Sequence, residues 1–304
     1  MLLTALKLIL KSKPSKHSVF KSTGVTIKQF YRYLFNKSNC DRLIKLLSEE
    51  NLKKTLEVSP LIPFKMTRPY FCKNLEASGR FEVLNNHYTF LKDNYSYLVP
   101  SLFSDEGLFL GKFQGENSYK FTLKNDNTMR REVELTLSIS DDEFRLYSIG
   151  FNLQKIKNSD EYGIFIANIQ GPEPSVPDMH NMTKVLTKAS FGVQPRYLVI
   201  DVLFNIAKAL KINHVYAIRT EAHVFMSKKH KDNLGSKIMT NFDEIWSVYN
   251  SKNYDESFVE IFEEERKAME DISSNKRSMY RKRYAWLDEL KVSIEEAISN
   301  PKVE

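Results

Sequence analysis

The sequence has little cysteine and no long apolar run. Its 304 residues include two cysteines, Cys40 and Cys72, and no Cys-x-x-Cys pair. A disulfide scaffold and a cysteine zinc site are therefore both unsupported, and a reducing compartment is expected. No stretch reaches the roughly 18 consecutive apolar residues that a membrane-spanning helix needs. We therefore expect no metal site, no transmembrane segment and a cytoplasmic location.

The familiar catalytic motifs are missing as well. The sequence has no Walker A loop, no Gly-x-Gly-x-x-Gly, no His-Glu-x-x-His and no Gly-x-Ser-x-Gly. These absences argue against a P-loop, a dinucleotide fingerprint, a zinc protease motif and a nucleophile elbow, while an enzyme of another kind stays open. Any active site has to come from polar residues at the ends of helices and strands.

The charge is moderately positive. Lys and Arg number 45 against 38 Asp and Glu, which gives a net charge of +7 and attracts polyanions without selecting one. Residues 1–11 read as a short basic amphipathic helix rather than an export signal, because Lys7 interrupts the apolar stretch and no small-residue cleavage site follows. An anionic membrane surface is therefore one expected partner.

The chain divides into a helical extension over residues 1–60 and an α/β domain over residues 61–295. Within that domain we expect a core over 105–225 and a helical C-terminal part over 240–298. Apolar and polar residues alternate between Gly107 and Gln170 in short runs separated by Asn and Asp, which predicts an antiparallel meander. The predicted strands are 108–110, 119–123, 133–139, 146–151 and 163–167.

A mostly apolar helix over 196–210 follows, and then a β-branched and aromatic run at 214–218. Strand, crossover helix and strand form a parallel pair, so the fold class is α+β (mixed α/β). We expect a long proline-rich loop between residues 171 and 195. An acidic helix containing Glu263, Glu264 and Glu265 is expected before the last helix.

Two features mark a candidate ligand site after the predicted meander. Gln170-Gly171 ends a strand abruptly, either as a plain turn or as a tip that a ligand can approach, because Gly has no Cβ. Arg196 lies near the start of the crossover helix, where a cation is unfavourable unless a carboxylate or an anionic ligand accompanies it. Lys188, between these two features, completes the predicted ligand-binding set.

Arg219, Glu221 and His223 follow the predicted strand 214–218. Their side chains share one face if the strand continues through them. An arginine, a carboxylate and an imidazole together can bind an anion and move a proton, so these are the candidate catalytic residues. The alternative is a solvated strand end.

A basic run with interleaved tyrosines begins the C-terminal helix. It can hold phosphates and stack on bases, as in nucleic-acid-binding proteins. Pairing with Glu263, Glu264 and Glu265 would neutralise it, which argues against nucleic-acid binding. We therefore predict that the run forms a surface for an anion or a partner. The residues are Lys276, Arg277, Arg281, Lys282, Arg283 and Tyr284.

Short segments spread over residues 65 to 295 together resemble the VirK/YbjX family of bacterial proteins. The resemblance implies a role in the cell envelope, namely outer-membrane display of virulence factors and resistance to antimicrobial peptides, but no reaction. It also implies a partner in an envelope pathway. The segments are Arg68-Pro69-Tyr70, His87-Tyr88, Ile169-Gln170-Gly171, Leu186-Thr187-Lys188, Phe191 to Arg196, Ala222-His223-Val224, Phe242 to Trp246, and Ile272 to Asp288.

The predicted element order also resembles the core of the Gcn5-related acyltransferases. In that core a strand tip and a helix N-terminus hold acyl-CoA or the phosphopantetheine of an acyl carrier protein. The compact Arg/Gln-x-x-Gly-x-Gly/Ala loop of those enzymes is absent here. Three functions therefore stay open: an envelope factor, an acyltransferase acting on an envelope component, and a protein that binds anionic membranes or nucleic acid.

Overall fold

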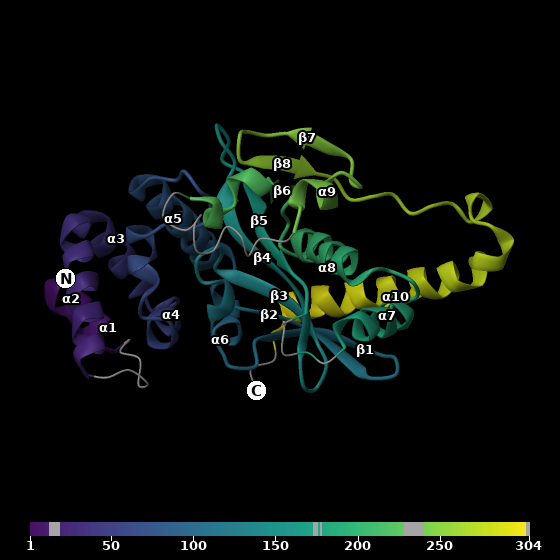
Figure 1. The fold of residues 1–304 in the computed structure, drawn as a ribbon, viewed down its shortest axis with the longest axis horizontal. Coiled ribbons are helices and arrows are strands. Elements are labelled where there is room, and N and C mark those ends of the chain that lie inside the picture. Colours follow the sequence, from purple (N-terminus) through teal and green to yellow (C-terminus); the bar gives the residue numbers. More distant parts are fainter. Residues whose placement is uncertain (12–18, 173–175, 177, 228–239, 302–304) are drawn as a thin grey trace.

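The computed structural model describes residues 1–11, 19–172, 176, 178–227 and 240–301, with the side chains of residues 19–23 left aside. A central sheet carries helices on its faces, and a group of helices from the N-terminus stands at one end (Figure 1). This mixed α/β architecture confirms the predicted fold class.

The sheet has eight strands in the order β1-β2-β3-β4-β5-β6-β8-β7. Every neighbouring pair is antiparallel except β5 and β6, which are parallel. The predicted meander and the added parallel strand are therefore both present. The bounds are β1 (Leu108–Gln114), β2 (Ser118–Lys124), β3 (Leu135–Ser140), β4 (Arg145–Lys155), β5 (Tyr162–Gln170), β6 (His214–Ile218), β7 (Ser251–Asn253) and β8 (Phe258–Ile261).

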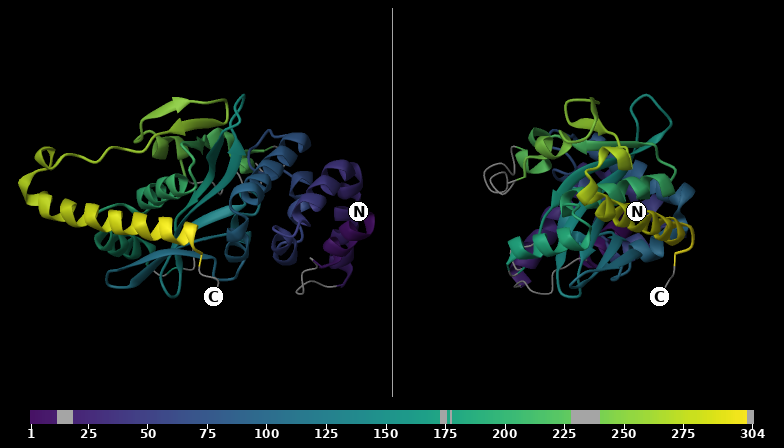
Figure 2. Two further views of the ribbon diagram at one scale, coloured as in Figure 1. Left: turned by 180° about the vertical axis from the view of Figure 1, so that it is seen from behind. Right: turned by 90° about the vertical axis from the view of Figure 1, so that its right-hand side faces the viewer.

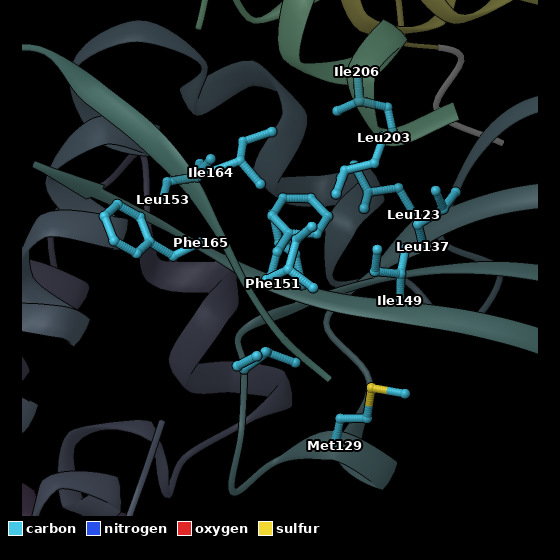
Figure 3. Packing of buried hydrophobic residues seen from close by; sticks show 14 of the residues in the cluster. Leu123, Met129, Leu137, Ile149, Phe151, Leu153, Ile164, Phe165, Leu203 and Ile206 are labelled. Carbon is cyan, nitrogen blue, oxygen red and sulfur yellow. The ribbon is translucent and has the colours of Figure 1, made fainter. Parts of the chain in front are cut away.

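Strand β4 lies at the centre of the hydrophobic core. Its residues from Ser148 to Gln154 are all buried, which requires cover on both faces because successive side chains point to opposite sides. The crossover helix α8 (Pro195–Ala209) packs on β3, β4 and β6, and α5 (Ala77–Asn94) packs on β4. Figure 3 shows Leu203 and Ile206 of α8 facing the strand side chains, with Met129 across the sheet.

The helices of the N-terminal region are α1 (Leu2–Lys11), α2 (Val19–Phe35), α3 (Lys37–Leu47) and α4 (Lys53–Val58), followed by the 3-10 turn η1 (Ile62–Thr67). Helix α3 and η1 both contact α5. The short helices η2 (Ser96–Leu98), α6 (Val99–Leu102) and η3 (Asn127–Met129) lie around the meander. The predicted helical character of this region is therefore present.

Two expectations for the second half of the chain are wrong. Residues 179–189 form helix α7 (Met179–Ala189) instead of a loop, and the Asp178 side chain caps it by accepting from the Asn181 amide at 3.3 Å. Residues 173–175 and 177 of the expected loop lie outside the described residues. The expected acidic helix is absent, because β8 pairs with β6 and β7 and residues 262–268 leave it in an irregular conformation.

The C-terminal third adds α9 (Phe242–Trp246), the turn η7 (Met269–Asp271) and the long helix α10 (Ser274–Ser299). Helix α10 packs on β1 and on α8. Figure 2 shows it crossing the molecule beside α7 and α8. The end of the chain therefore contributes to the same side of the domain as α7.

Gly150 in β4 has room for no side chain. A Cβ there would lie 2.7 Å from Val133 and 2.8 Å from the Met129 sulfur. We expect Gly150→Ala to lower the free energy of unfolding by about 1–3 kcal/mol, because overpacking a buried site forces its neighbours to move.

The matched control is Gly24→Ala in helix α2, where a Cβ would meet nothing within 4 Å. It should raise stability by roughly 0.5–1 kcal/mol, the gain expected for alanine in a helix. Urea denaturation of both variants measures the difference, and equal effects would contradict the packing argument.

Candidate functional site

Strand β5 separates from β6 before it ends. The two strands pair from Gly163 to Ile166, and β5 then continues to Gln170 paired with β4 alone. The register shifts at this point, because Gly150 and Phe151 of β4 face Asn168 and Ile166, which leaves Ala167 as an extra residue. Such a β-bulge bends the strand. In the described part of the chain, Ala167–Gln170 therefore have no strand partner on the β6 side.

The predicted tip lies at the edge of a cleft. A Cβ on Gly171 would lie 3.7 Å from the ring of Tyr147, and Tyr147 lines the cleft. The cleft has a volume of about 620 Å³. Its remaining walls are α7, the turn between α7 and α8, the first turn of α8, and Met279 of α10.

One face of α7 supplies most of the polar lining. The side chains recur at intervals of three and four residues, which places them on one stripe of the helix. Two of the predicted ligand-binding residues, Lys188 and Arg196, line this cleft, while His180 and Lys184 were not predicted. The stripe consists of His180, Thr183, Lys184, Thr187 and Lys188.

The described residues that line the cleft include cations and no carboxylate. Lys188 makes an exposed ion pair with Glu116 at 3.3 Å. Arg196 is the second residue of α8, with its guanidinium 5.5 Å from the centre of the Tyr197 ring. Among the described residues no carboxylate pairs with Arg196, and a cation at the first turn of a helix favours an anionic partner.

Arg283 of α10 holds the turn between α7 and α8. Its Nε and Nη2 donate to the carbonyl of Phe191 at 3.0 and 2.5 Å. Phe191 and Gly192 both have positive φ, of 52° and 82°. A Cβ on Gly192 would come within 3.1 Å of the Arg283 guanidinium, so glycine is required there. Arg283 thus shapes the wall of the cleft rather than an open surface.

The rest of the predicted basic run divides into two groups. Arg277 donates to the Ile272 and Glu270 carbonyls, and the Tyr284 ring lies 5.0 Å below the Arg266 guanidinium. Lys276, Arg281 and Lys282 are exposed and have no ion pair within the described ranges.

The expected pairing of this run with Glu263, Glu264 and Glu265 is not found among the described residues. Glu263 pairs with Lys208 of α8 at 2.5 Å instead. Three cations of α10 therefore face solvent.

The three candidate catalytic residues do not meet in the cleft. Strand β6 ends at Ile218, and the turns η4 (Thr220–Ala222) and η5 (Val224–Met226) follow, so the side chains do not alternate on one face. Arg219 donates to Asn253 at 2.6 Å, and Glu221 is exposed with its carboxylate 3.8 Å from Lys73.

His223 is buried. Its Nδ1 accepts from the Phe225 amide at 3.2 Å, and its ring stacks on Phe242. Burial lowers its pKa to about 4, so the imidazole is neutral near pH 7. The prediction that Arg219, Glu221 and His223 share one face required β6 to continue through them. Because β6 ends at Ile218, their side chains do not share a face.

Comparison with known proteins places the chain in a family. Residues 19–296 match the family described as "Protein of unknown function (DUF535)". The chain belongs to this family. An "Uncharacterized protein YbjX" of Escherichia coli K12 is 30% identical over 243 residues, which are 78% of this chain and 72% of that protein. This confirms the VirK/YbjX resemblance. An uncharacterized Haemophilus influenzae protein is 25% identical over 269 residues, 88% of this chain and 87% of its own length.

Two of the motifs behind that resemblance meet around one buried carboxylate. Glu134 accepts from Lys65 and from the Tyr70 hydroxyl, each at 2.6 Å, and from the Tyr88 hydroxyl at 2.5 Å. Burial, and then the nearby Glu134 charge, raises the pKa of both phenols. His87 is also buried, and its Nδ1 accepts from the Leu153 amide. Arg68-Pro69-Tyr70 and His87-Tyr88 therefore meet at the core.

The described residues hold no group of three or more His, Cys, Asp or Glu side chains arranged for a metal ion. Cys40 and Cys72 are both buried and unpaired. None of the helices in the described ranges has the length and apolar character needed to cross a lipid bilayer.

The buried carboxyl of Glu132 makes the stability of the protein depend on pH. Its side chain is buried, it accepts from the Arg131 amide at 3.1 Å, and burial raises its pKa to about 7. The unfolded chain releases this proton near pH 4.5, so the folded state binds the additional proton between pH 4.5 and 7. The contribution of Glu132 to stability is therefore complete below pH 4.5 and is lost as the pH rises to 7.

We expect Glu132→Gln to remove this loss. Between pH 5 and 8, the free energy of unfolding should therefore decrease by up to about 3 kcal/mol less in the variant than in the wild type. Guanidinium denaturation at both pH values measures it. Glu289→Gln, at an exposed position of α10, should leave the wild-type slope unchanged. Identical slopes for wild type and Glu132→Gln would show that Glu132 ionises in the same way in both states.

Proposed function

We propose that the chain binds a CoA thioester, or the phosphopantetheine of an acyl carrier protein, in the cleft between α7 and α8. It would then transfer the acyl group to a component of the bacterial envelope. The location would be the cytoplasmic side of the inner membrane, where both donors are available. The proposal gives a chemical basis to the envelope role that the family resemblance implies.

The observation that carries the proposal is the cationic lining of this cleft beside the free end of β5, with no carboxylate among its described residues. Lys184, Lys188 and Arg196 line it, and the amino-terminal end of α8 adds a positive dipole end. Phosphate and pyrophosphate groups are suited to such a site, because the cationic side chains and the positive end of the helix dipole both attract them. CoA and phosphopantetheine both carry these groups.

The separation of β5 from β6 supports a thioester in particular. Alternate amides of Ala167–Gln170 point away from β4, and no described strand pairs with them. An extended pantetheine chain carries amide groups that can add to such an edge in the way a peptide does. The likeness to the Gcn5-related layout is an analogy of fold, and function rests on the site itself.

Acyl transfer also needs a group to move a proton. The acceptor's hydroxyl or amine loses a proton as it attacks the thioester carbonyl, and the departing thiolate gains one. Tyr147 and His180 line the cleft and can take these roles. His223 is a poor candidate because its imidazole is buried elsewhere.

Isothermal titration with CoA and acyl-CoA tests the binding step. We expect the double variant Lys184→Ala/Arg196→Ala to weaken CoA binding at least tenfold, since each charge-assisted phosphate contact contributes about 1.5–3 kcal/mol. Incubation of the wild type with radiolabelled acyl-CoA and a membrane extract then tests transfer. A Tyr147→Phe or a His180→Gln variant should form less acylated product than the wild type.

The control Lys45→Ala/Lys252→Ala removes the same charge from exposed positions outside the cleft. It should bind CoA like the wild type. Equal weakening in the two double variants would indicate nonspecific attraction. Failure of CoA, acyl-CoA and acyl carrier protein to bind the wild type would refute the proposal.

A further inference from the structure

A second and larger cleft lies where the N-terminal helices meet the sheet domain. Its volume is about 770 Å³. Residues of α1 and α2 form one wall, residues 57–70 form the floor, and the segment Asn127–Arg131 closes the other side. Figure 1 shows the N-terminal helices at the opposite end of the molecule from α7 and the first turns of α10. This cleft is therefore distinct from the proposed CoA site.

The lining of this second cleft is strongly cationic. Seven of its residues are lysine or arginine, and Glu57 is its one carboxylate. Lys65 is already neutralised by Glu134, and Lys11 donates to the Glu57 backbone carbonyl at 2.9 Å. The cations are Lys11, Lys28, Arg32, Lys65, Arg68, Arg130 and Arg131.

Four of the cations are arginines, and one of them, Arg131, has the Glu132 carboxylate nearby. Arg68 donates to the neutral Gln29 side chain at 2.7 Å. Arg32, Arg68, Arg130 and Arg131 form no ion pair in the ranges that the structure describes. Partial burial, and then the positive charges of the other three, lowers the pKa of Arg68. Grouped guanidinium groups repel one another, and an anion bound between them would relieve that repulsion.

The outer face of α2 is apolar and exposed. Ile27, Tyr31, Leu34 and Phe35 lie on one stripe at intervals of three and four residues, and Phe35 is 86% exposed. Lys28 and Arg32, which line the cleft, lie next to this stripe in the angular order of the helix. The neighbouring α1 adds further apolar side chains at the surface, which are Leu2, Leu3 and Leu10.

The charge of this region has one sign. The first 40 residues contain seven lysines, one arginine and no Asp or Glu, whereas the whole chain has a net charge of +7. A protein partner that covered only the apolar stripe would leave these charges unpaired. An anionic bilayer satisfies both features, because its interface takes apolar side chains and its headgroups carry phosphate.

We propose that α1 and α2 dock on the surface of an anionic phospholipid bilayer, with one headgroup phosphate held by Arg32, Arg68, Arg130 and Arg131. The apolar stripe of α2 inserts at the level of the headgroups, and the cations along its edge face the phosphates. Arginine suits this position because its planar fork binds phosphate through two hydrogen bonds. The docking requires no activity in the α7–α8 cleft.

Co-sedimentation with lipid vesicles tests the proposal. We expect the full chain to bind vesicles of phosphatidylcholine mixed with phosphatidylglycerol, and not vesicles of phosphatidylcholine alone. Arg130→Gln/Arg131→Gln and Tyr31→Ser/Phe35→Ser should each weaken binding about tenfold or more. Lys45→Gln/Lys252→Gln removes the same charge outside both clefts and should change binding less than threefold. Circular dichroism confirms that each variant is folded.

Four results would overturn the proposal. They are equal loss in the cleft and control variants, equal binding to neutral vesicles, loss of binding on Lys276→Gln/Lys282→Gln instead, and a dimer of the free protein that Phe35→Ser dissociates. A fifth result would also overturn it: if inorganic pyrophosphate stabilises the protein and vesicles do not bind, the arginines hold a soluble phosphate. CoA titration of the same variants should match the wild type, which separates this proposal from the first.

Discussion

The buried carboxylate of Glu134 is the constraint on which much of the molecule depends. A carboxylate removed from water needs several partners, and here a lysine and two tyrosine hydroxyls supply them. These partners come from the segment after α4 and from α5, so one charge joins the N-terminal region to the sheet. Lys65 and Tyr70 also line the second cleft. The position of that cleft therefore follows from how the core satisfies Glu134.

The sheet could be predicted because its strands follow one rule. Each meander strand alternates or runs apolar between Asn- and Asp-rich turns, and the buried α8 and β6 stand out by apolar content. Strands β7 and β8 could not be predicted in the same way, because β7 is three residues long and entirely exposed. Glu263 to Glu265 favour a helix locally, yet residues 262–268 leave β8 to reach α10, which lies across the domain.

The candidate site was only partly accessible from sequence for a related reason. Helix α7 packs Leu186 on the core and turns a polar face to the cleft, but the three prolines just before it favoured a loop that continues to residue 195. Lys188 and Arg196 stood in recognisable segments, whereas His180 and Lys184 did not. Arg219, Glu221 and His223 were grouped by a periodicity that ends with β6, and nothing in the local sequence marks Ile218 as its last residue.

The hydrogen bonds from Arg283 to the Phe191 carbonyl join residues 92 positions apart in the chain. Helices α7 and α8 leave the ribosome well before that arginine is synthesised. During this interval the turn with two positive-φ residues lacks the guanidinium that fixes it, and closing so long a loop has an entropic cost. The basic cleft is thus among the last parts of the domain to form during biosynthesis. A nascent chain can assemble most of its sheet before it can hold a ligand there.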